Sequence, residues 1–260
     1  MTAPSLPFPL DSIYFFFEGA RLSFVPTLRM VFSKPSLLLH PHTLSKLSFS
    51  YLWNVMGPGI DSNSQAWKHT LLYPNAEGIV LDVGAGHGHT MQYLDKSRVS
   101  RYVAIEPNEY MHEKIREMGR KCGFDDDSVV IIGFGAEETD KVWTSVGGDG
   151  RVDTIVAIRT LCSVKQPQKM INRLVREVLR PGGQMLWCEH VKSPFWKVQL
   201  WQRVFSPIWG VVYDGCRLGQ DTVSMLLAAG PWSTTEVEGL PGEEAKGNML
   251  YHKMGRFVKA

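Results

Sequence analysis

The residues best suited to chemistry are three glycines and one acid that lie close together. Gly84, Gly86 and Gly88 follow an apolar run, residues 79–83, which contains Asp82. The apolar run predicts a buried parallel strand, and the glycines predict a tight turn into a helix. Glycine reaches backbone angles that a Cβ atom forbids, and it lets the main chain approach a ligand closely. The spacing therefore predicts a ligand-binding turn, and a turn that binds nothing is the alternative.

A second acid lies where a ligand with a ribose would need it. Glu106 follows Gly86 by twenty residues and ends another short apolar run, Tyr102–Ile105. A carboxylate at the end of the neighbouring strand can accept hydrogen bonds from both hydroxyls of a ribose. We therefore expect Glu106 to hold the ribose of a bound cofactor.

The glycine spacing separates two kinds of cofactor. A dinucleotide fingerprint places its third glycine three residues after the second. His89 stands at that position here, and the third glycine is Gly88. An acid two residues before the first glycine, Asp82, suits a ligand ammonium group better than a phosphate. A nicotinamide-dependent oxidoreductase is therefore a weaker alternative than an enzyme whose cofactor ends in an amino acid.

Composition excludes several classes of partner. The chain has 260 residues, 44% of them hydrophobic and 21% charged, with a net charge of +2. It shows no basic cluster, so we expect no nucleic-acid partner. The histidines lack the spacing of metal ligands, and no metal site is expected. The four cysteines form no C-x-x-C pair, which favours reduced thiols and a cytoplasmic location; they are Cys122, Cys162, Cys188 and Cys216.

The second part of the chain, residues 75–260, alternates strands and helices, which predicts a parallel sheet. With two further strands near the C-terminus, we expect an α/β fold: a Rossmann-like, seven-stranded, mostly parallel sheet with helices on both faces. The predicted strands are 78–83, 101–106, 128–132, 152–158, 184–190, 234–239 and 249–258. The predicted helices are 89–94, 108–122, 168–179, 196–212 and 221–229.

Residues 1–74 are expected to form a helical lid over this catalytic domain. The segment 11–32 is rich in aromatic residues, but charges interrupt it and Pro26 should break it, so it is a poor transmembrane helix. Two roles are open for this segment, and they are compatible: it covers the substrate as a lid, or it lies peripherally on an intracellular membrane. Helical spacing continues over 36–73, with an end at Gly57–Gly59 and a new cap at Asp61 or Ser62.

Several motifs together resemble a known family. The pattern D-x-G-x-G-x-G at residues 82–88, the turn Leu179–Gly183 and the segment Ile105–Asn108 resemble the class I S-adenosylmethionine-dependent methyltransferases. Within that class the chain is similar to the branch of ubiquinone-biosynthesis methyltransferases, and most similar to the membrane-associated alkyl thiol methyltransferases called methyltransferase-like proteins. The residues that carry the closer similarity are 160–165, 189–191, 201–209 and 214–216.

This resemblance implies S-adenosylmethionine as the cofactor and assigns residues to it. Asp82 and the three glycines would surround the methionine end, and Glu106 would hold the ribose. The adenine would lie beside Pro107 and Asn108, and also beside the loop formed by Gly135, Ala136 and Glu137. Arg159 and Thr160 would face the sulfonium at the carboxyl end of a strand, where ligands collect in open parallel sheets.

The expected reaction is in-line displacement, in which an acceptor nucleophile attacks the sulfonium methyl group. A thiol acceptor needs little general-base help, whereas a hydroxyl would need His190 or Asp214. The alternatives are a hydrogen-bonded His190 that closes its strand and an Asp214 that caps a turn. Cys162 and Cys188 are expected to be buried apolar residues.

The aromatic N-terminal segment favours an apolar small-molecule acceptor, with S-, O-, N- and C-methylation left open. The second hypothesis is a protein that keeps the methyltransferase fold but does not transfer a methyl group. Its pocket would then promote a reaction such as a cyclisation, with the cofactor in a structural role, or the protein would serve as a binding subunit.

Overall fold

One sheet forms the centre of the molecule. The computed structural model describes residues 8–243 and 247–260. Within them, seven strands lie in the order β3-β2-β1-β4-β5-β7-β6. Strands β1 to β5 are parallel, and β7 is antiparallel to both β5 and β6. The predicted fold class is confirmed. The strands are β1 Gly78–Val83, β2 Val99–Ile105, β3 Val129–Ile132, β4 Val152–Ile158, β5 Leu179–His190, β6 Trp232–Gly239 and β7 His252–Lys259.

Alternate residues of each strand face opposite sides of the sheet, which gives the fold two cores. Leu81 and Val83 of β1 join one buried cluster, to which α5, α6 and α8 contribute. Val80 joins the other, to which α3 and α4 contribute. Helices therefore cover both faces, as expected. Their bounds are α3 Gln65–Leu72, α4 His112–Lys121, α5 Thr139–Val146, α6 Pro167–Arg173 and α8 Thr222–Leu227.

Two long helices precede the sheet, and both continue through residues that were expected to end them. The first, α1 (Leu10–Ser33), contains Pro26, and α2 (Pro41–Ser62) contains Gly57–Gly59. The predicted break and the predicted end are therefore wrong. A proline removes one intrahelical hydrogen bond, whereas packing along the whole helix favours its continuation. Residues 1–7 of the predicted 1–74 segment lie outside the described residues.

Asp61 is not a helix cap but a buried residue inside α2. Its carboxylate accepts hydrogen bonds from Lys68 Nζ at 2.5 Å and from the Tyr93 hydroxyl at 2.9 Å. These contacts tie α2 to α3 and to the 3-10 helix η2 (His89–Tyr93), which stands where a helix over 89–94 was predicted. The end of α2 is thereby fixed beside the glycine turn.

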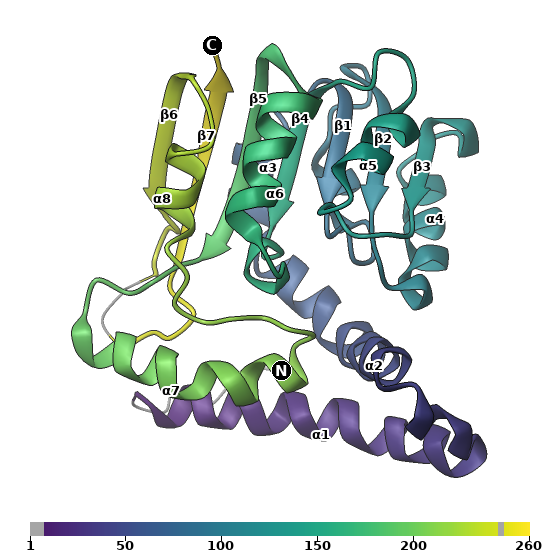
Figure 1. Ribbon diagram of the computed structural model, residues 1–260, viewed down its shortest axis with the longest axis vertical. Coiled ribbons are helices and arrows are strands. Elements are labelled where there is room, and N and C mark those ends of the chain that lie inside the picture. The colour runs from purple at the N-terminus through teal and green to yellow at the C-terminus, as the bar shows by residue number, and fades with distance from the viewer. Residues whose placement is uncertain (1–7, 244–246) are drawn as a thin grey trace.

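A helical layer lies beyond the carboxyl ends of the parallel strands. Figure 1 shows α1, α2 and α7 (Trp196–Val212) there, with α1 and α7 side by side. A Cβ atom on Gly19 of α1 would lie 2.3 Å from the Tyr213 hydroxyl oxygen, so glycine allows this close approach. The Tyr213 hydroxyl donates a hydrogen bond to the Phe15 carbonyl at 3.0 Å. Among the described helices, none has the length and apolarity needed to span a bilayer.

Candidate functional site

The glycine turn lies at the carboxyl end of β1. Gly84, Gly86 and Gly88 have φ values of 69°, 57° and 75°, a region that favours glycine. A Cβ atom on Gly84 would lie 2.0 Å from Thr160 Oγ1, and one on Gly86 would lie 3.0 Å from Trp53 Nε1. The turn is therefore bare backbone at the point where β1, β4 and α2 meet.

Asp82 lies behind this turn. Its side chain is buried, and it accepts a hydrogen bond from the Tyr102 hydroxyl. Burial raises the pKa of Asp82 to about 6, although Tyr102 and Thr90 stabilise its ionised form. The carboxyl group therefore braces β1 against β2 and supports the turn from the side of the core.

Glu106 reaches the glycine turn directly. Its carboxylate accepts from the backbone amides of Gly86 and Asn108, each at 2.8 Å. Burial raises the pKa of Glu106 to about 7, while these two amides favour the ionised form. A carboxylate has about four lone-pair sites, so it can accept from ligand hydroxyls as well.

Helix α2 lies against the residues that follow Glu106. Lys46 Nζ donates to the Pro107 carbonyl at 2.6 Å, and Asn108 Nδ2 donates to the Lys46 carbonyl at 2.8 Å. The structure thus brings Glu106, Pro107 and Asn108 together with the glycine turn and places them beneath the helical layer.

The loop after β3 divides into buried and exposed parts. Ala136 is buried, whereas Glu137 is exposed and lines a second, smaller hollow with Lys165 and Arg173. Gly135 lies close to Glu137, since a Cβ atom on it would be 2.2 Å from Glu137 Oε2. Of the loop residues predicted to lie beside the adenine, Ala136 therefore faces the core, whereas Glu137 faces solvent.

Arg159 and Thr160 follow β4 and face different partners. Arg159 has a φ of 55°, and its guanidinium donates to His252 Nε2 and to Ser64 Oγ, each at 3.2 Å. The backbone amide of Thr160 donates to Glu189 Oε1 at 2.7 Å. Glu189 accepts from Leu161 as well, at 2.9 Å, and so fixes the start of the loop after β4.

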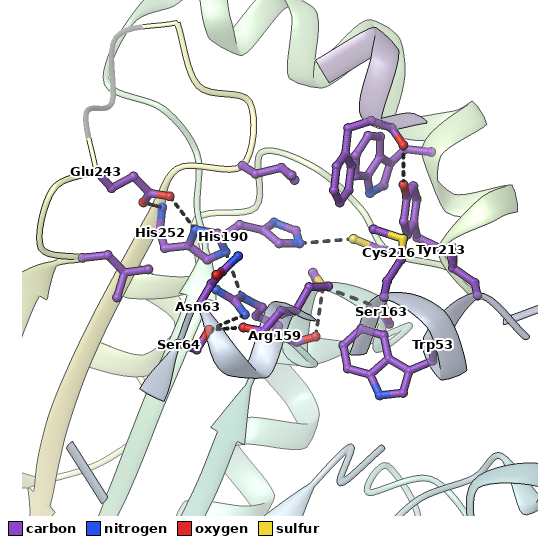
Figure 2. A pocket seen from close by; sticks show the side chains of 18 of the residues that line it. Trp53, Asn63, Ser64, Arg159, Ser163, His190, Tyr213, Cys216, Glu243 and His252 are labelled. Atoms are coloured by element: carbon purple, nitrogen blue, oxygen red, sulfur yellow. Dashed lines mark hydrogen bonds and ion pairs between the residues drawn. The ribbon is translucent and has the colours of Figure 1, made fainter. Parts of the chain in front are cut away.

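A cavity of about 450 Å³ lies between the helical layer and the ends of β4 and β5. Its wall is largely apolar and aromatic, and its polar end is formed by side chains at the ends of β5 and β7 and in the segments after β4, α7 and β6 (Figure 2). The aromatic and apolar wall includes Phe15, Phe49, Trp53, Met56, Trp209 and Tyr213. The polar end includes Arg159, Cys162, His190, Cys216, Glu243 and His252.

His190 and His252 lie at this polar end with different partners. His190 Nε2 is 3.1 Å from Cys216 Sγ, and both residues are buried. His252 Nδ1 is 2.9 Å from Glu243 Oε1. Burial lowers the pKa of His252 to about 4 despite this carboxylate, so the ring is neutral and Nε2 can accept from Arg159.

The two candidate bases are separated in space. His190 lines the cavity, whereas Asp214 is not among its lining residues. Asp214 has a φ of 46°, and its Oδ1 accepts from Ser45 Oγ at 3.1 Å, which joins the turn after α7 to α2. The placement favours His190 over Asp214 as a group that meets the acceptor.

Sequence reasoning missed several residues of the polar end. Cys162 was expected to be only a buried apolar residue, and Cys216 and His252 had no predicted role. The neighbouring Cys216 thiol and burial hold the pKa of the Cys162 thiol well above its usual value. The one sequence signal was that Cys162 and Cys216 fall in segments that resemble the thiol methyltransferase branch.

Comparisons with known proteins agree with this geometry. The model of a family described as a methyltransferase domain matches residues 62–218. The thiol S-methyltransferase TMT1B of Homo sapiens is 29% identical over 252 residues, which cover 90% of this chain and 98% of that protein.

Two solved structures share the fold. The YcgJ protein of Bacillus subtilis has a TM-score of 0.57 at 16% identity, over 76% of this chain and 98% of that one. The N-methyltransferase NodS of Bradyrhizobium japonicum, in complex with S-adenosyl-L-homocysteine, has a TM-score of 0.50 at 13% identity, over 76% of this chain and 86% of that one.

Proposed function

Since this chain belongs to the family of methyltransferase domains and is an S-adenosylmethionine-dependent methyltransferase, we propose that it methylates the thiol of an apolar small molecule. The observation that carries the proposal is the cavity of about 450 Å³, whose wall is aromatic and whose polar end holds sulfur and imidazole groups. The similarity to a thiol S-methyltransferase over 98% of that protein supports the choice of sulfur.

The residues around the glycine turn fit the cofactor. The turn is a cradle that Cβ atoms at Gly84 and Gly86 would fill. It would hold the methionine end, and Glu106 would hold the ribose beside Asn108. Arg159 and Thr160 lie at the end of β4 between this turn and the cavity, where the reacting groups would meet. When bound, the cofactor supplies an electrophilic methyl group.

The chain's own contribution is alignment and exclusion of water. The apolar wall holds the acceptor in one orientation, and correct alignment of two reactants can lower a barrier by about 7–11 kcal/mol at best. His190 lies at the polar end, where it can receive the proton of an acceptor held against the wall. We infer an in-line displacement, since the turn lies against Thr160 and the cavity is lined by the neighbouring Arg159, so that cofactor and acceptor would meet at the end of β4.

Acceptor chemistry is tested with matched compounds. The purified chain is incubated with S-adenosylmethionine and an alkyl thiol, alcohol or amine of equal length, and the methylated product and S-adenosylhomocysteine are quantified by mass spectrometry. We expect kcat/KM for the thiol to exceed that for the alcohol and the amine at least ten-fold. Phe49→Ala should raise KM for the thiol, and Leu227→Ala, on the surface of α8, should not. Equal turnover of thiol and alcohol, or no methyl transfer to any of them, would refute the proposal.

We also propose that α1 and α7 rest on a phospholipid surface. Exposed apolar residues of α7 recur at helical spacing, and α1 carries exposed phenylalanines; Val211 and Phe32 are each 81% exposed. The two helices lie side by side (Figure 1), and Lys197 and Arg203 of α7 are exposed, which suits anionic lipid headgroups. An apolar acceptor that dissolves in a membrane would then enter a cavity lined by the same two helices. The exposed apolar residues of α7 are Trp196, Leu200, Val204, Ile208 and Val211.

Vesicle sedimentation tests this contact. We expect the wild-type chain to pellet with vesicles of phosphatidylcholine and phosphatidylserine. The double variant Val204→Ser/Val211→Ser should bind at least ten-fold more weakly. Leu227→Ser/Val237→Ser replaces exposed residues of α8 and β6 instead and should bind as the wild type does. A wild-type chain that stays in the supernatant, or equal losses in both variants, would contradict the proposal.

A further inference from the structure

Three potential metal ligands meet at the polar end of the cavity, although they come from distant segments. Cys162 lies in η5 (Leu161–Ser163), His190 ends β5, and Cys216 lies in the turn after α7. One ligand atom of each residue lies within 4.8 Å of the other two. All three residues are buried, and all three line the cavity.

Hydrogen bonds outside the cluster hold these three segments in place. The Arg217 amide donates to the Cys162 carbonyl at 3.1 Å, and Gln220 Nε2 donates to the same oxygen at 3.0 Å. Glu189 fixes the loop that carries Cys162, and His190 is paired with His252 across the β5–β7 ladder. The ligand atoms are therefore brought together by the fold, which lowers the cost of ordering them around an ion.

The type and spacing of these ligands fit zinc. Two thiolates and one imidazole form a soft to borderline set that binds Zn²⁺ in tetrahedral geometry. With bonds of about 2.3 Å to sulfur and 2.0 Å to nitrogen, ligand atoms stand roughly 3.5–3.8 Å apart. His190 Nε2 is 3.1 Å from Cys216 Sγ, so small side-chain rotations suffice. Three protein ligands leave a fourth position, as in catalytic zinc sites.

We propose that Cys162, His190 and Cys216 bind one Zn²⁺ ion whose fourth position takes the sulfur of the acceptor thiol. The identity of the acceptor rests on the proposed function, whereas the metal site rests on the cluster alone. As the thiol binds, its proton passes to solvent and the sulfur becomes a zinc-bound thiolate. The sulfur's electron pair then forms the bond to the methyl carbon while that carbon's bond to the sulfonium sulfur breaks. The product is a neutral thioether, which binds zinc more weakly than the thiolate and leaves.

This assignment changes the role of His190. A ring nitrogen that binds zinc does not accept the acceptor's proton, so the ion, rather than a base, makes the thiolate available. The sequence prediction of no metal site rested on the spacing of histidines along the chain. Local spacing does not detect this cluster, because each ligand lies on a different segment at the carboxyl edge of the sheet.

Metal content and spectroscopy test the site without reference to turnover. The full chain, purified under reducing conditions without chelators, should contain about one zinc per molecule by elemental mass spectrometry. Cys162→Ser and Cys216→Ser should each lower bound zinc at least ten-fold. Cys188→Ser is the matched control, because Cys188 is buried in β5 and does not line the cavity; this variant should keep its zinc. Cobalt(II) added to the chelator-treated chain should give the absorption bands of tetrahedral thiolate ligation.

Several results would overturn the site. They are zinc below a tenth of an equivalent together with no thiolate–cobalt band, zinc that survives both cysteine variants, and a Cys162–Cys216 disulfide that persists in metal-free chain purified under reducing conditions. Methyl transfer separates the two proposals. Zinc bound by the cysteines without any thiol methylation would overturn the proposed function and leave the site standing. Equal thiol methylation by zinc-loaded and zinc-free chain would overturn the role of the metal and leave the function standing.

Discussion

Glu106 should make cofactor binding depend on pH near neutrality. Burial raises the pKa of this carboxyl to about 7, and only the ionised form accepts strongly from two ribose hydroxyls. With that pKa the ionised fraction is about one eleventh at pH 6 and about ten elevenths at pH 8. We therefore expect the affinity for S-adenosylmethionine to rise about ten-fold between these two pH values.

The effect on stability has the opposite sign. Because the pKa of Glu106 is raised above its ordinary 4.5, the folded chain holds this proton more tightly than the unfolded chain does. The contribution of Glu106 to the stability of the ligand-free chain is therefore complete below about pH 4.5, and it declines as pH rises through about 7. A gain in affinity over this range therefore runs opposite to the contribution of Glu106 to stability.

Calorimetric titration at pH 6, 7 and 8 measures the effect, with Glu106→Gln as the matched variant. Glutamine keeps the shape of the side chain but stays neutral. A hydrogen bond to a charged group contributes about 1.5–3 kcal/mol, so at pH 8 the variant should bind at least ten-fold more weakly. Burial raises the pKa of Asp82 to about 6, and this residue is unchanged in the variant, so a smaller slope is expected to remain. An affinity of the wild type that does not change between pH 6 and 8, or an equal slope in the variant, would refute the assignment of Glu106.

Two further substitutions follow from the geometry. Gly84→Ala should abolish cofactor binding and lower the melting temperature, because the added Cβ would lie 2.0 Å from Thr160 Oγ1 at a φ of 69°. Calorimetric titration and a thermal melt measure these two effects. The control is Gly242→Ala, which is also at positive φ but in open space and should keep its affinity for the cofactor. Lys68→Met should destabilise the fold by about 3–5 kcal/mol, because it leaves the buried Asp61 carboxylate without its ion-pair partner. Removing both charges with Asp61→Leu/Lys68→Met should recover part of that loss in chemical denaturation, and no recovery would mean that the pair is not coupled.

The strands were the easiest part of the fold to predict. Strand β4 begins at Val152 and ends at Ile158, as predicted, because its apolar residues pack against both cores. A strand buried on both faces has a nearly continuous apolar sequence, and that pattern is recognisable without tertiary information. Helix α7, Trp196–Val212, was also predicted with its observed bounds.

The N-terminal helices were harder because distant contacts decide where they end. Pro26 and Pro58 are local signals to stop a helix, yet α1 and α2 continue through them. The continuous α1 packs on α7, where Gly19 meets Tyr213, a residue almost 200 positions away. A contact of this kind has no signature in the residues near the proline, so local rules placed both ends too early.

The residues of the glycine turn were likewise easier to predict than those at the polar end of the cavity. Gly84 and Glu106 were predictable because the strand–turn–helix unit fixes their spacing along the chain, and the structure joins them through the Gly86 amide. Cys162, His190 and Cys216 obey no such spacing, since η5 after β4, the end of β5 and the turn after α7 each contribute one residue. The parallel sheet brings the ends of neighbouring strands to one edge, and the turn after α7 adds Cys216. Cys162 and His190 therefore meet because one follows β4 and the other ends the adjacent strand β5, although they are far apart in sequence.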